Sequence, residues 1–370
     1  MPSNRLICTV TNDLNQDQRM LRICLSLQKM GFDVTLVGRL KKSSLPLPVV
    51  PFKLKRLHCF FEQRFVFYAE YNIRLFLYLL TQRFSVLYAV DLDTIVPVGL
   101  VSIMKNKSFI FDAHEHFTET PELVDRKWVR NFWNKIAHFW IPKANKCITV
   151  NKSLADLFTS LYGKTFGFLY NVPSFETSTT AFEYTSNRKR ILYQGVLNVG
   201  RGLEPLIAAM KDLPECELWI VGEGNLSASL REEASKTSAA DRIVFTGWKH
   251  GEDLKQLTRS AWLGVNFLES RSLSYYYSLA NKFFDYIHAG LPAIHMNFPE
   301  YQQIISKYPA ALTINELTAE NIVSAIRQII DQPKKYDEMK KACMEAQKEF
   351  YWEKEEKKLI DITSPFLIKS

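Results

Sequence analysis

The chain has 370 residues, of which 47% are hydrophobic and 13% aromatic; it can therefore build more than one buried core, which argues against disorder. Its 47 Lys and Arg against 39 Asp and Glu give a formal net charge of +8, which favours an anionic partner such as a nucleotide or a phospholipid surface. The six cysteines lie far apart without a Cys-x-x-Cys pair, so neither a zinc site nor a disulfide framework is indicated and a reducing cytoplasm is the expected compartment.

The N-terminal segment does not resemble a signal peptide, because polar residues from Asn12 to Arg19 interrupt it at once. The most apolar run, IRLFLYLL at 73–80, is far shorter than the roughly 20 residues that span a bilayer. We therefore expect neither export nor a membrane-spanning helix.

In the first half of the chain, short β-rich runs alternate with helical patterns, which is typical of a parallel sheet covered by helices. The expected strands are RLICTVT (5–11), DVTLVG (33–38), VLYAV (86–90), SFIFDAH (108–114), KCITVN (146–151) and FGFLYN (166–171). The expected helices cover about 17–30, 64–82, 130–141 and 152–162.

A polar stretch rich in Thr and Ser, FETSTTAFEYTSNRKR at 175–190, has no clear period and reads as a linker. The alternation then restarts, with strands RILYQG (190–195), CELWIVGEG (216–224), RIVFTGW (242–248), LGVNFLE (263–269), PAIHMN (292–297) and AALTIN (310–315). The pattern predicts two doubly wound Rossmann-like α/β domains that face a cleft, residues 1–174 and 175–351. A C-terminal helix at about 352–370 is expected to cross back to the first domain, and ligands of such sheets bind beyond the carboxyl ends of the strands.

Three glycine-containing turns follow strands of the second half. In YQGVLNVGRG, a loop from Gly195 carries Arg201 next to the start of a helix, a pattern that suits a phosphate group. Gly222, Gly224 and Gly247 lie in similar turns. Tight turns with a solvent-facing arginine explain the same residues, so these turns taken alone leave both interpretations open.

The stretch SLANKFFDYIHAGLP, residues 278–292, predicts a helix that begins near Asn281, a plausible N-cap, and ends before Gly290. Lys282 opposes the helix dipole in the first turn, which suggests a bound anion, and Asp285 shares its face and can accept hydrogen bonds from two hydroxyls. An internal ion pair between Lys282 and Asp285 is the alternative.

These motifs in this order, with VFTG at 244–247, resemble the donor-binding half of a retaining family four glycosyltransferase with the GT-B fold, of the bacterial glycosyl transferase group 1 type. The first half resembles the acceptor domain of the same family through DQRMLRICLSLQKMGFDVTLVGR (17–39), DLDT (91–94) and FDAHEHFTETPELV (111–124). The resemblance implies transfer of a sugar from a UDP- or GDP-sugar without metal or cofactor, to a glycan or lipid-linked acceptor in bacterial surface polysaccharide assembly. The expected location is the cytoplasm, with peripheral docking at the inner membrane.

By the same resemblance, Arg201 holds the diphosphate and Asp285 the ribose hydroxyls, while the glycine turns leave room for phosphate and base. The sequence departs from the family where an arginine after the first glycine is Val196 and where a glutamate is Tyr277. Our hypothesis is that Lys282 replaces the missing cation and that backbone amides at 279–281 contact the sugar or phosphate.

In the first half, FDAHEHF places a His-Glu-His cluster at the end of a strand. By similarity, His114 lies near the transferred sugar and phosphate, and Glu115 contacts the acceptor or donor sugar. Asp17 and Arg19 are candidates for the acceptor, with capping and surface roles equally open.

Two further patterns have ordinary explanations. Asp91 and Asp93 resemble a metal-binding Asp-x-Asp, but a capping or acceptor role fits the doubly wound fold better and no metal is expected. The segment PFKLKRLHCFFEQRFVFYAEYNIRLF (51–76) mixes basic and aromatic residues as a face that docks on an anionic membrane does, and core packing of a helix explains it equally well.

Other functions fit less well. A nucleotide-sugar epimerase shares the fold, and Val196 with Tyr277 suggest a catalytically idle sugar-nucleotide binding protein. A dinucleotide-dependent oxidoreductase lacks its Gly-x-Gly-x-x-Gly after the first strand. Only net charge favours nucleic acid, and no nucleic-acid partner is expected.

Overall fold

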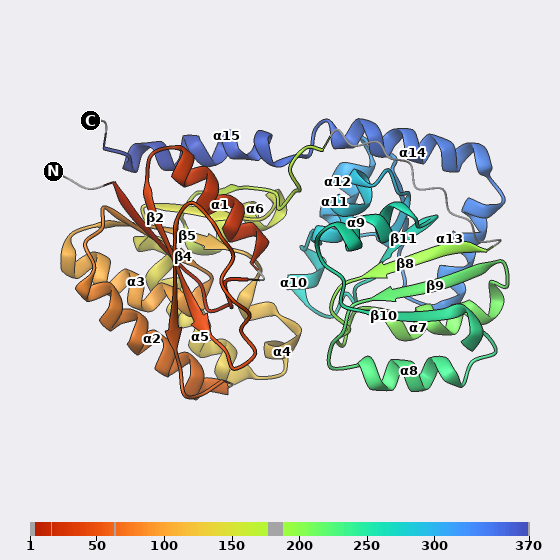
Figure 1. Ribbon diagram of the computed structural model, residues 1–370, viewed down its shortest axis with the longest axis horizontal. Coiled ribbons are helices and arrows are strands. Elements are labelled where there is room, and N and C mark those ends of the chain that lie inside the picture. The colour runs from red at the N-terminus through yellow and green to blue at the C-terminus, as the bar shows by residue number, and fades with distance from the viewer. Residues whose placement is uncertain (1–3, 16, 63, 177–187, 369–370) are drawn as a thin grey trace. The chain divides into compact units, whose positions relative to one another are not determined.

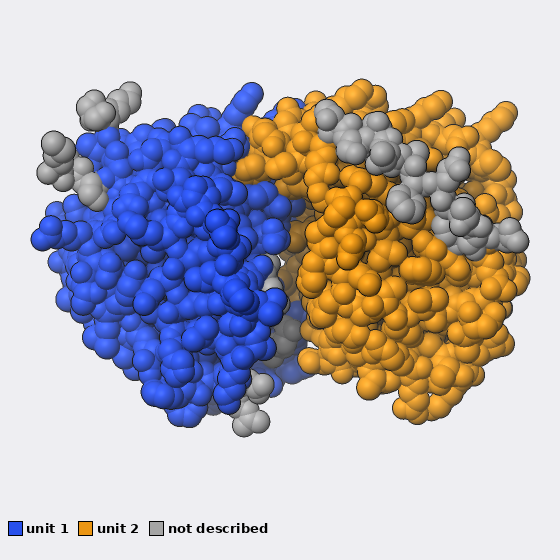
Figure 2. Space-filling view, in the orientation of Figure 1, with its two compact units in different colours: residues 1–171, 354–370 blue, residues 172–353 orange. Residues whose placement is uncertain are grey.

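The computed structural model describes residues 4–15, 17–62, 64–176 and 188–368, so most of the predicted linker lies outside the described residues. The chain divides into two compact units (Figure 2). Unit 1 comprises residues 1–171 and 354–370, and unit 2 comprises residues 172–353. Each unit is built around its own parallel sheet.

The sheet of unit 1 has seven parallel strands in the order β3-β2-β1-β4-β5-β6-β7. Its strands are β1 (Arg5–Thr9), β2 (Asp33–Leu40), β3 (Lys53–His58), β4 (Val86–Val90), β5 (Ser108–Ala113), β6 (Lys146–Thr149) and β7 (Phe166–Phe168). The central strands are continuous apolar runs because helices cover the sheet on both faces; every residue of β4 is buried.

The helices of unit 1 form two layers on this sheet. They are α1 (Gln18–Lys29), α2 (Arg64–Thr81), α3 (Leu92–Lys105), α4 (Pro121–Val124), α5 (Lys127–Trp140), α6 (Lys152–Tyr162) and α15 (Trp352–Thr363). Helix α3 packs between α2 and α5 on one face of the sheet, while α1 and α15 lie on the other (Figure 1). The Ser26 hydroxyl of α1 donates to Glu356 of α15, so the C-terminal helix does return to the N-terminal region.

Residues 53–58, for which no strand is predicted, form β3 at the edge of the sheet. The segment KLKRLH alternates charged and apolar side chains, and Leu57 is its buried residue. Lysines on an edge strand are common because they prevent pairing with another chain. Core packing of a helix, one of the two explanations given for 51–76, is therefore wrong for residues 53–58, while membrane docking stays a prediction.

The sheet of unit 2 has six parallel strands in the order β10-β9-β8-β11-β12-β13, and all six predicted strands are confirmed. They are β8 (Lys189–Gln194), β9 (Cys216–Val221), β10 (Ile243–Gly247), β11 (Leu263–Asn266), β12 (Ala293–Met296) and β13 (Ala311–Ile314). The helices are α7 (Leu203–Ala209), α8 (Ser227–Ser235), α9 (Gly251–Arg259), α10 (Leu273–Tyr276), α11 (Asn281–His288), α12 (Pro299–Ile305), α13 (Ala319–Ile330) and α14 (Pro333–Gln347).

In both sheets the chain order of the strands reverses at one place. In unit 1 it reverses between β1 and β4, and in unit 2 between β8 and β11. Open parallel sheets bind ligands beyond the carboxyl ends of the strands at such a switch point. The loops after β4 and β8, which begin at Asp91 and Gly195, are therefore the places to look for a site.

Candidate functional site

The glycine turns of unit 2 pack against one another at the carboxyl edge of the sheet. A Cβ on Gly222 would lie 1.9 Å from the carbonyl oxygen of Gly195, and one on Gly224 would lie 2.4 Å from that of Leu197. Backbone therefore fills the space that the missing side chains provide. The missing side chains at Gly222 and Gly224 bring the loops after β8 and β9 together, and the contact of these turns with a ligand stays a prediction.

Lys282 points from the first turn of α11 to the end of β8. Its side chain is 8% exposed, and its ammonium lies 3.2 Å from the position that a Cβ on Gly195 would take. The ammonium also lies 3.8 Å from the centroid of the Tyr193 ring, a cation–π contact. Burial, and then repulsion by Arg201, hold the pKa of Lys282 well below its usual range. A buried lysine thus stands beside the first glycine of the loop.

Asp285 has a different partner from the predicted ion pair. Its Oδ2 accepts a 2.9 Å hydrogen bond from Gln194 Nε2, and Gln194 Oε1 accepts one of 2.8 Å from Thr258. Among the described residues no ion pair joins Lys282 to Asp285, although attraction by the carboxylate partly offsets the lowering of the pKa of Lys282. The alternative explanation for Lys282 is therefore wrong.

Arg201 lies in the same loop as Gly195, against an aromatic ring of α10. Its guanidinium carbon is 4.9 Å from the centroid of Tyr275. Within the described part of the chain, the buried Nε of Arg201 has no hydrogen-bond partner. Arg201 and Lys282 also repel each other, as the lowered pKa of Lys282 records. The unit therefore holds two cations close together near one strand end, which an anion would stabilise.

Asn281 is not the N-cap of α11. Ala280 takes that position, and its own amide donates a 3.1 Å hydrogen bond to the hydroxyl of Tyr301. The same hydroxyl accepts from Asn266 Nδ2 at 2.9 Å. The hydroxyl of Tyr301 thus fixes the turn before α11. Because the amide of Ala280 donates to this hydroxyl, it is not available to the sugar or phosphate, contrary to the hypothesis for the amides at 279–281.

The two positions that depart from the family pattern lie in the loop after β8 and at the end of α10. Val196 is 39% exposed, and its carbonyl accepts a 2.9 Å hydrogen bond from Tyr193. Tyr277 ends α10, and its ring centroid lies 5.1 Å from that of Tyr276. Neither side chain carries the charge that the family position carries. Gly247, the last glycine of the predicted set, ends β10, and a Cβ there would make only an ordinary contact with Glu223.

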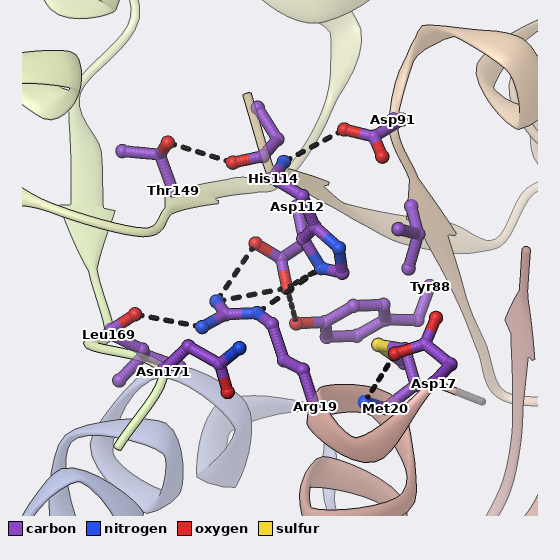
Figure 3. A network of polar contacts seen from close by, with 12 residues as sticks. Asp17, Arg19, Met20, Tyr88, Asp91, Asp112, His114, Thr149, Leu169 and Asn171 are labelled. Carbon is purple, nitrogen blue, oxygen red and sulfur yellow. Dashed lines mark hydrogen bonds and ion pairs between the residues drawn. The ribbon is translucent and has the colours of Figure 1, made fainter. Parts of the chain in front are cut away.

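In unit 1, a buried polar network joins three elements (Figure 3). Asp112 of β5 is completely buried; it accepts from Arg19 of α1 at 3.3 Å and from the Tyr88 hydroxyl of β4 at 2.7 Å. Arg19 also donates to the carbonyl of Leu169 at 2.8 Å. Arg19 is therefore a core residue, and the predicted surface role for it is wrong. Asp17 caps α1 by accepting from the amide of Met20 at 3.0 Å.

His114 extends this network toward the strand end. Its Nε2 lies 3.2 Å from both Asp112 Oδ2 and Arg19 Nε. Burial alone would lower the pKa of His114, but the Asp112 carboxylate outweighs it and raises the pKa to about 8. Burial would raise the pKa of Asp112, yet Arg19 and His114 together hold it well below its usual range. The contact with Asp112 suits an imidazolium that donates Nε2–H, whereas the contact with Arg19 suits a neutral ring that accepts at Nε2. The raised pKa favours the imidazolium, in which Nδ1–H is left for another oxygen.

Asp91 lies at the switch point of unit 1 in a conformation that non-glycine residues rarely adopt, with φ of 55°. Its Oδ1 accepts a 2.8 Å hydrogen bond from the amide of His114. Desolvation raises the pKa of Asp91 to about 8 and that of Asp93, which accepts from the Thr11 hydroxyl, to about 6. Neither side chain caps α3 as predicted for Asp93, and the described residues contain no group of three or more metal-ligating side chains.

The predicted His-Glu-His cluster separates in the structure. Glu115 is exposed beside His114, whereas His116 turns into the core and its ring meets Phe158 edge-on at 5.3 Å. Burial, with Arg130 nearby, lowers the pKa of His116 to about 4, so this residue is neutral. The site in unit 1 therefore keeps His114 and Glu115, the two residues proposed as catalytic, without His116.

Sequence reasoning missed the residues that position these groups: Tyr88, Asp112, Tyr193, Gln194 and Thr258. The signal for Asp112 was present, since a carboxylate inside an apolar strand needs a buried partner. Gln194, the last residue of β8, is likewise a polar side chain in an apolar strand that needs a buried partner. Their partners come from distant segments, which local periodicity does not reveal.

Two doubly wound parallel units in one chain define the GT-B fold. The sucrose-phosphate synthase of Thermosynechococcus elongatus is similar to this chain with a TM-score of 0.81 at 15% identity over 98% of both chains. Anabaena HepE, solved in complex with UDP-glucose, has a TM-score of 0.76 at 11% identity over 98% of this chain and 99% of its own. WaaG, a glycosyltransferase involved in lipopolysaccharide biosynthesis, has a TM-score of 0.69 at 15% identity over 97% and 99%.

Residues 176–345, a little under half of the chain, match the family described as glycosyl transferases group 1. Residues 176–345 therefore belong to this family, and they make the chain a glycosyltransferase that takes its sugar from a nucleotide sugar. None of the curated protein sequences compared with the chain matches it. Within the described ranges, no helix is both long and apolar enough to cross a lipid bilayer.

Proposed function

We propose that this enzyme transfers a sugar, with retention of anomeric configuration, from a uridine diphosphate sugar to a glycan or lipid-linked acceptor of a bacterial cell surface. In this proposal residues 175–351 bind the donor, and residues 1–174 with the helix at 352–370 bind the acceptor. One observation carries the donor site: the buried ammonium of Lys282 lies beside Gly195 at the end of β8, 3.2 Å from where a Cβ would stand.

The charges of unit 2 suit a nucleoside diphosphate. Lys282 and Arg201 repel each other in the absence of an anion, and a diphosphate between them would relieve that repulsion and form charge-assisted hydrogen bonds. Arg201 offers a planar guanidinium and Lys282 a point charge. Together they would replace the arginine that the family has at the position of Val196. Cations supplied by the protein would do the work that a metal does in other transferases.

Asp285 is the proposed acceptor of hydrogen bonds from the ribose hydroxyls. Gln194 holds one carboxylate oxygen at 2.9 Å and fixes the direction of the group. A carboxylate accepts at two oxygens with several lone pairs, so it can serve Gln194 and a pair of hydroxyls together. Gly247 and Asn281 complete the proposed donor site with room at the end of β10 and a polar side chain in the first turn of α11.

In unit 1, His114 and Glu115 are the proposed catalytic residues. The imidazolium of His114 would donate Nδ1–H to an oxygen of the transferred sugar or the phosphate, where negative charge develops as the bond to the diphosphate breaks. Its pKa of about 8 keeps that proton in place at neutral pH. Glu115 would accept from a sugar hydroxyl. The leaving diphosphate takes the proton of the acceptor, so this proposal needs no strong protein base.

The relatives support the choice of substrate class. Anabaena HepE was solved with UDP and with UDP-glucose, which favours a uridine donor, and WaaG acts in lipopolysaccharide biosynthesis, which favours a surface glycan as product. In a thermal-shift screen we therefore expect UDP and UDP-sugars to raise the melting temperature more than GDP and GDP-sugars, because a ligand of the folded state stabilises it. A response to GDP-sugars alone would contradict the uridine assignment.

Turnover separates the alternatives. With a UDP-sugar and bacterial lipid or glycan acceptors, the proposed enzyme releases UDP and forms a product whose anomeric configuration, read by NMR, is that of the donor. Conversion of one UDP-sugar into another without acceptor would identify an epimerase. Binding without transfer or slow hydrolysis would identify an idle binding protein, the alternative that Val196 and Tyr277 suggest.

A further inference from the structure

Helix α5 carries aromatic side chains outside the face that packs on unit 1. Trp133, Ala137 and Trp140 are buried in unit 1 and account for its packing on α3. On the outer face, Trp128, Phe132 and Phe139 are 91%, 46% and 56% exposed. The apolar side chains of a surface helix normally face the core that the helix packs on. The outer aromatic residues of α5 therefore need another explanation.

The aromatic surface continues onto α2. Phe65, which is 67% exposed, meets Phe132 edge-on with ring centroids 6.2 Å apart. We call Phe65, Trp128, Phe132 and Phe139 the aromatic face. Exposed apolar groups that gather on one side of a monomer mark a binding surface more often than single exposed residues do.

Positive charge surrounds the aromatic face. The segment 125–143 contains five Lys and Arg and a single acidic residue, Asp125. Lys127 and Lys135 are exposed on α5, and the ammonium of Lys143 lies 3.5 Å from the centroid of Phe139. Arg130 is the exception, because it pairs with the buried Glu119. Aromatic side chains among lysines suit the interface of a bilayer with anionic lipids, where rings sit at headgroup depth and lysines meet phosphates.

We propose that the aromatic face docks unit 1 on an anionic lipid bilayer. Docking would bring the enzyme to a lipid-linked acceptor, so the proposal rests on the proposed function. It places the docking surface on α5 instead of the basic and aromatic segment 51–76 that the sequence indicates. Lys53 pairs with Asp33 at 3.2 Å and Arg56 pairs with Asp13 at 2.6 Å, both in or beside the sheet of unit 1. The lysines of α5 and its end take their place.

The test is co-sedimentation of the full chain with vesicles of phosphatidylcholine alone or with phosphatidylglycerol added. The first variant combines Trp128→Ser with Phe132→Ser, and the second combines Lys127→Glu with Lys135→Glu. Phe175→Ser is the matched control, since Phe175 is an exposed aromatic residue of unit 2, 44% exposed. Circular dichroism and UDP binding of each variant confirm that it is folded.

We expect the wild type and Phe175→Ser to bind vesicles that contain phosphatidylglycerol, and both double variants to bind at least tenfold more weakly. Salt should release the wild type, because exposed charges are screened. No vesicle binding by the wild type, or equal binding to neutral vesicles, would overturn the proposal. Light scattering that shows a dimer lost in Trp128→Ser, Phe132→Ser would also overturn it, in favour of a second copy as the occupant. UDP binding that persists while vesicle binding fails would leave the donor proposal standing.

Discussion

Replacing Lys282 by methionine should have two opposite effects, one on the free enzyme and one on donor binding. Methionine has a similar length and no charge, so it removes an ammonium that is 8% exposed and repelled by Arg201. The loss of the cation–π contact with Tyr193 offsets part of that gain. We expect a net stabilisation of about 1 kcal/mol, which corresponds to a melting temperature about 2–4 °C higher for a domain of this size.

Donor binding should weaken in the same variant. A hydrogen bond to a charged group contributes about 1.5–3 kcal/mol, so the dissociation constant for UDP should rise roughly 10- to 150-fold. The pH dependence gives a second signature. Because the pKa of Lys282 is lowered in the free enzyme and a bound diphosphate raises it, binding takes up a proton and weakens as pH rises. Lys282→Met should lose this part of the pH dependence.

The assay is isothermal titration calorimetry with UDP at several pH values, in two buffers of different ionisation enthalpy so that proton uptake is measured directly. Lys211→Met is the control, since Lys211 is an exposed lysine of the same unit. It should bind UDP as the wild type does. A Lys282→Met enzyme with unchanged affinity and unchanged proton uptake would refute the diphosphate role of Lys282.

Other predictions follow from the buried groups. Arg19→Met removes one of the two cations beside the buried Asp112 and leaves only His114, so it should lower the free energy of unfolding by about 3–5 kcal/mol at pH 7; thermal or urea denaturation measures it, and a loss below about 1 kcal/mol would contradict the buried pair. Gly222→Ala should destabilise by at least about 3 kcal/mol, since its Cβ would stand 1.9 Å from the Gly195 carbonyl oxygen; a wild-type melting temperature would disprove that packing. The pKa of His114 is about 8 in the folded protein and about 6.5 in the unfolded chain. Its contribution to the free energy of unfolding, up to about 2 kcal/mol, is therefore complete below pH 6.5 and is lost as the pH rises through 8. Urea titrations should show this slope in the wild type and a flatter one in His114→Gln; identical slopes would argue against the link to Asp112.

The sequence was sufficient to predict the architecture of both sheets, because their central strands are continuous apolar runs such as VLYAV at 86–90. Strand β3 was not predicted, because its lysines alternate with apolar residues at a sheet edge instead of forming a continuous apolar run. The start of α11 at Asn281 was predicted correctly, but its N-cap is Ala280 instead of Asn281. The side-chain hydroxyl of Tyr301 holds the amide of Ala280 there, a contact that no local cap signal reveals.

The candidate site was harder to predict than the fold. The cations Arg201 and Lys282 were recognisable from loop and helix position, yet whether Lys282 pairs with Asp285 depended on Gln194, 91 positions away in the chain from Asp285. The Arg19–Asp112 pair spans 93 positions. Polar groups that meet only after the sheet is assembled leave no periodic signal, so their partners could not be deduced from sequence.

The central claim is that the nucleotide sugar binds at the carboxyl edge of the sheet in unit 2. Hydrogen–deuterium exchange of the full chain with and without a saturating UDP-sugar tests it most directly, since bound ligand slows exchange where it contacts or orders the backbone. We predict protection in peptides that cover 195–202 and 278–286. Protection confined to unit 1, or none in these peptides at saturation, would contradict the claim.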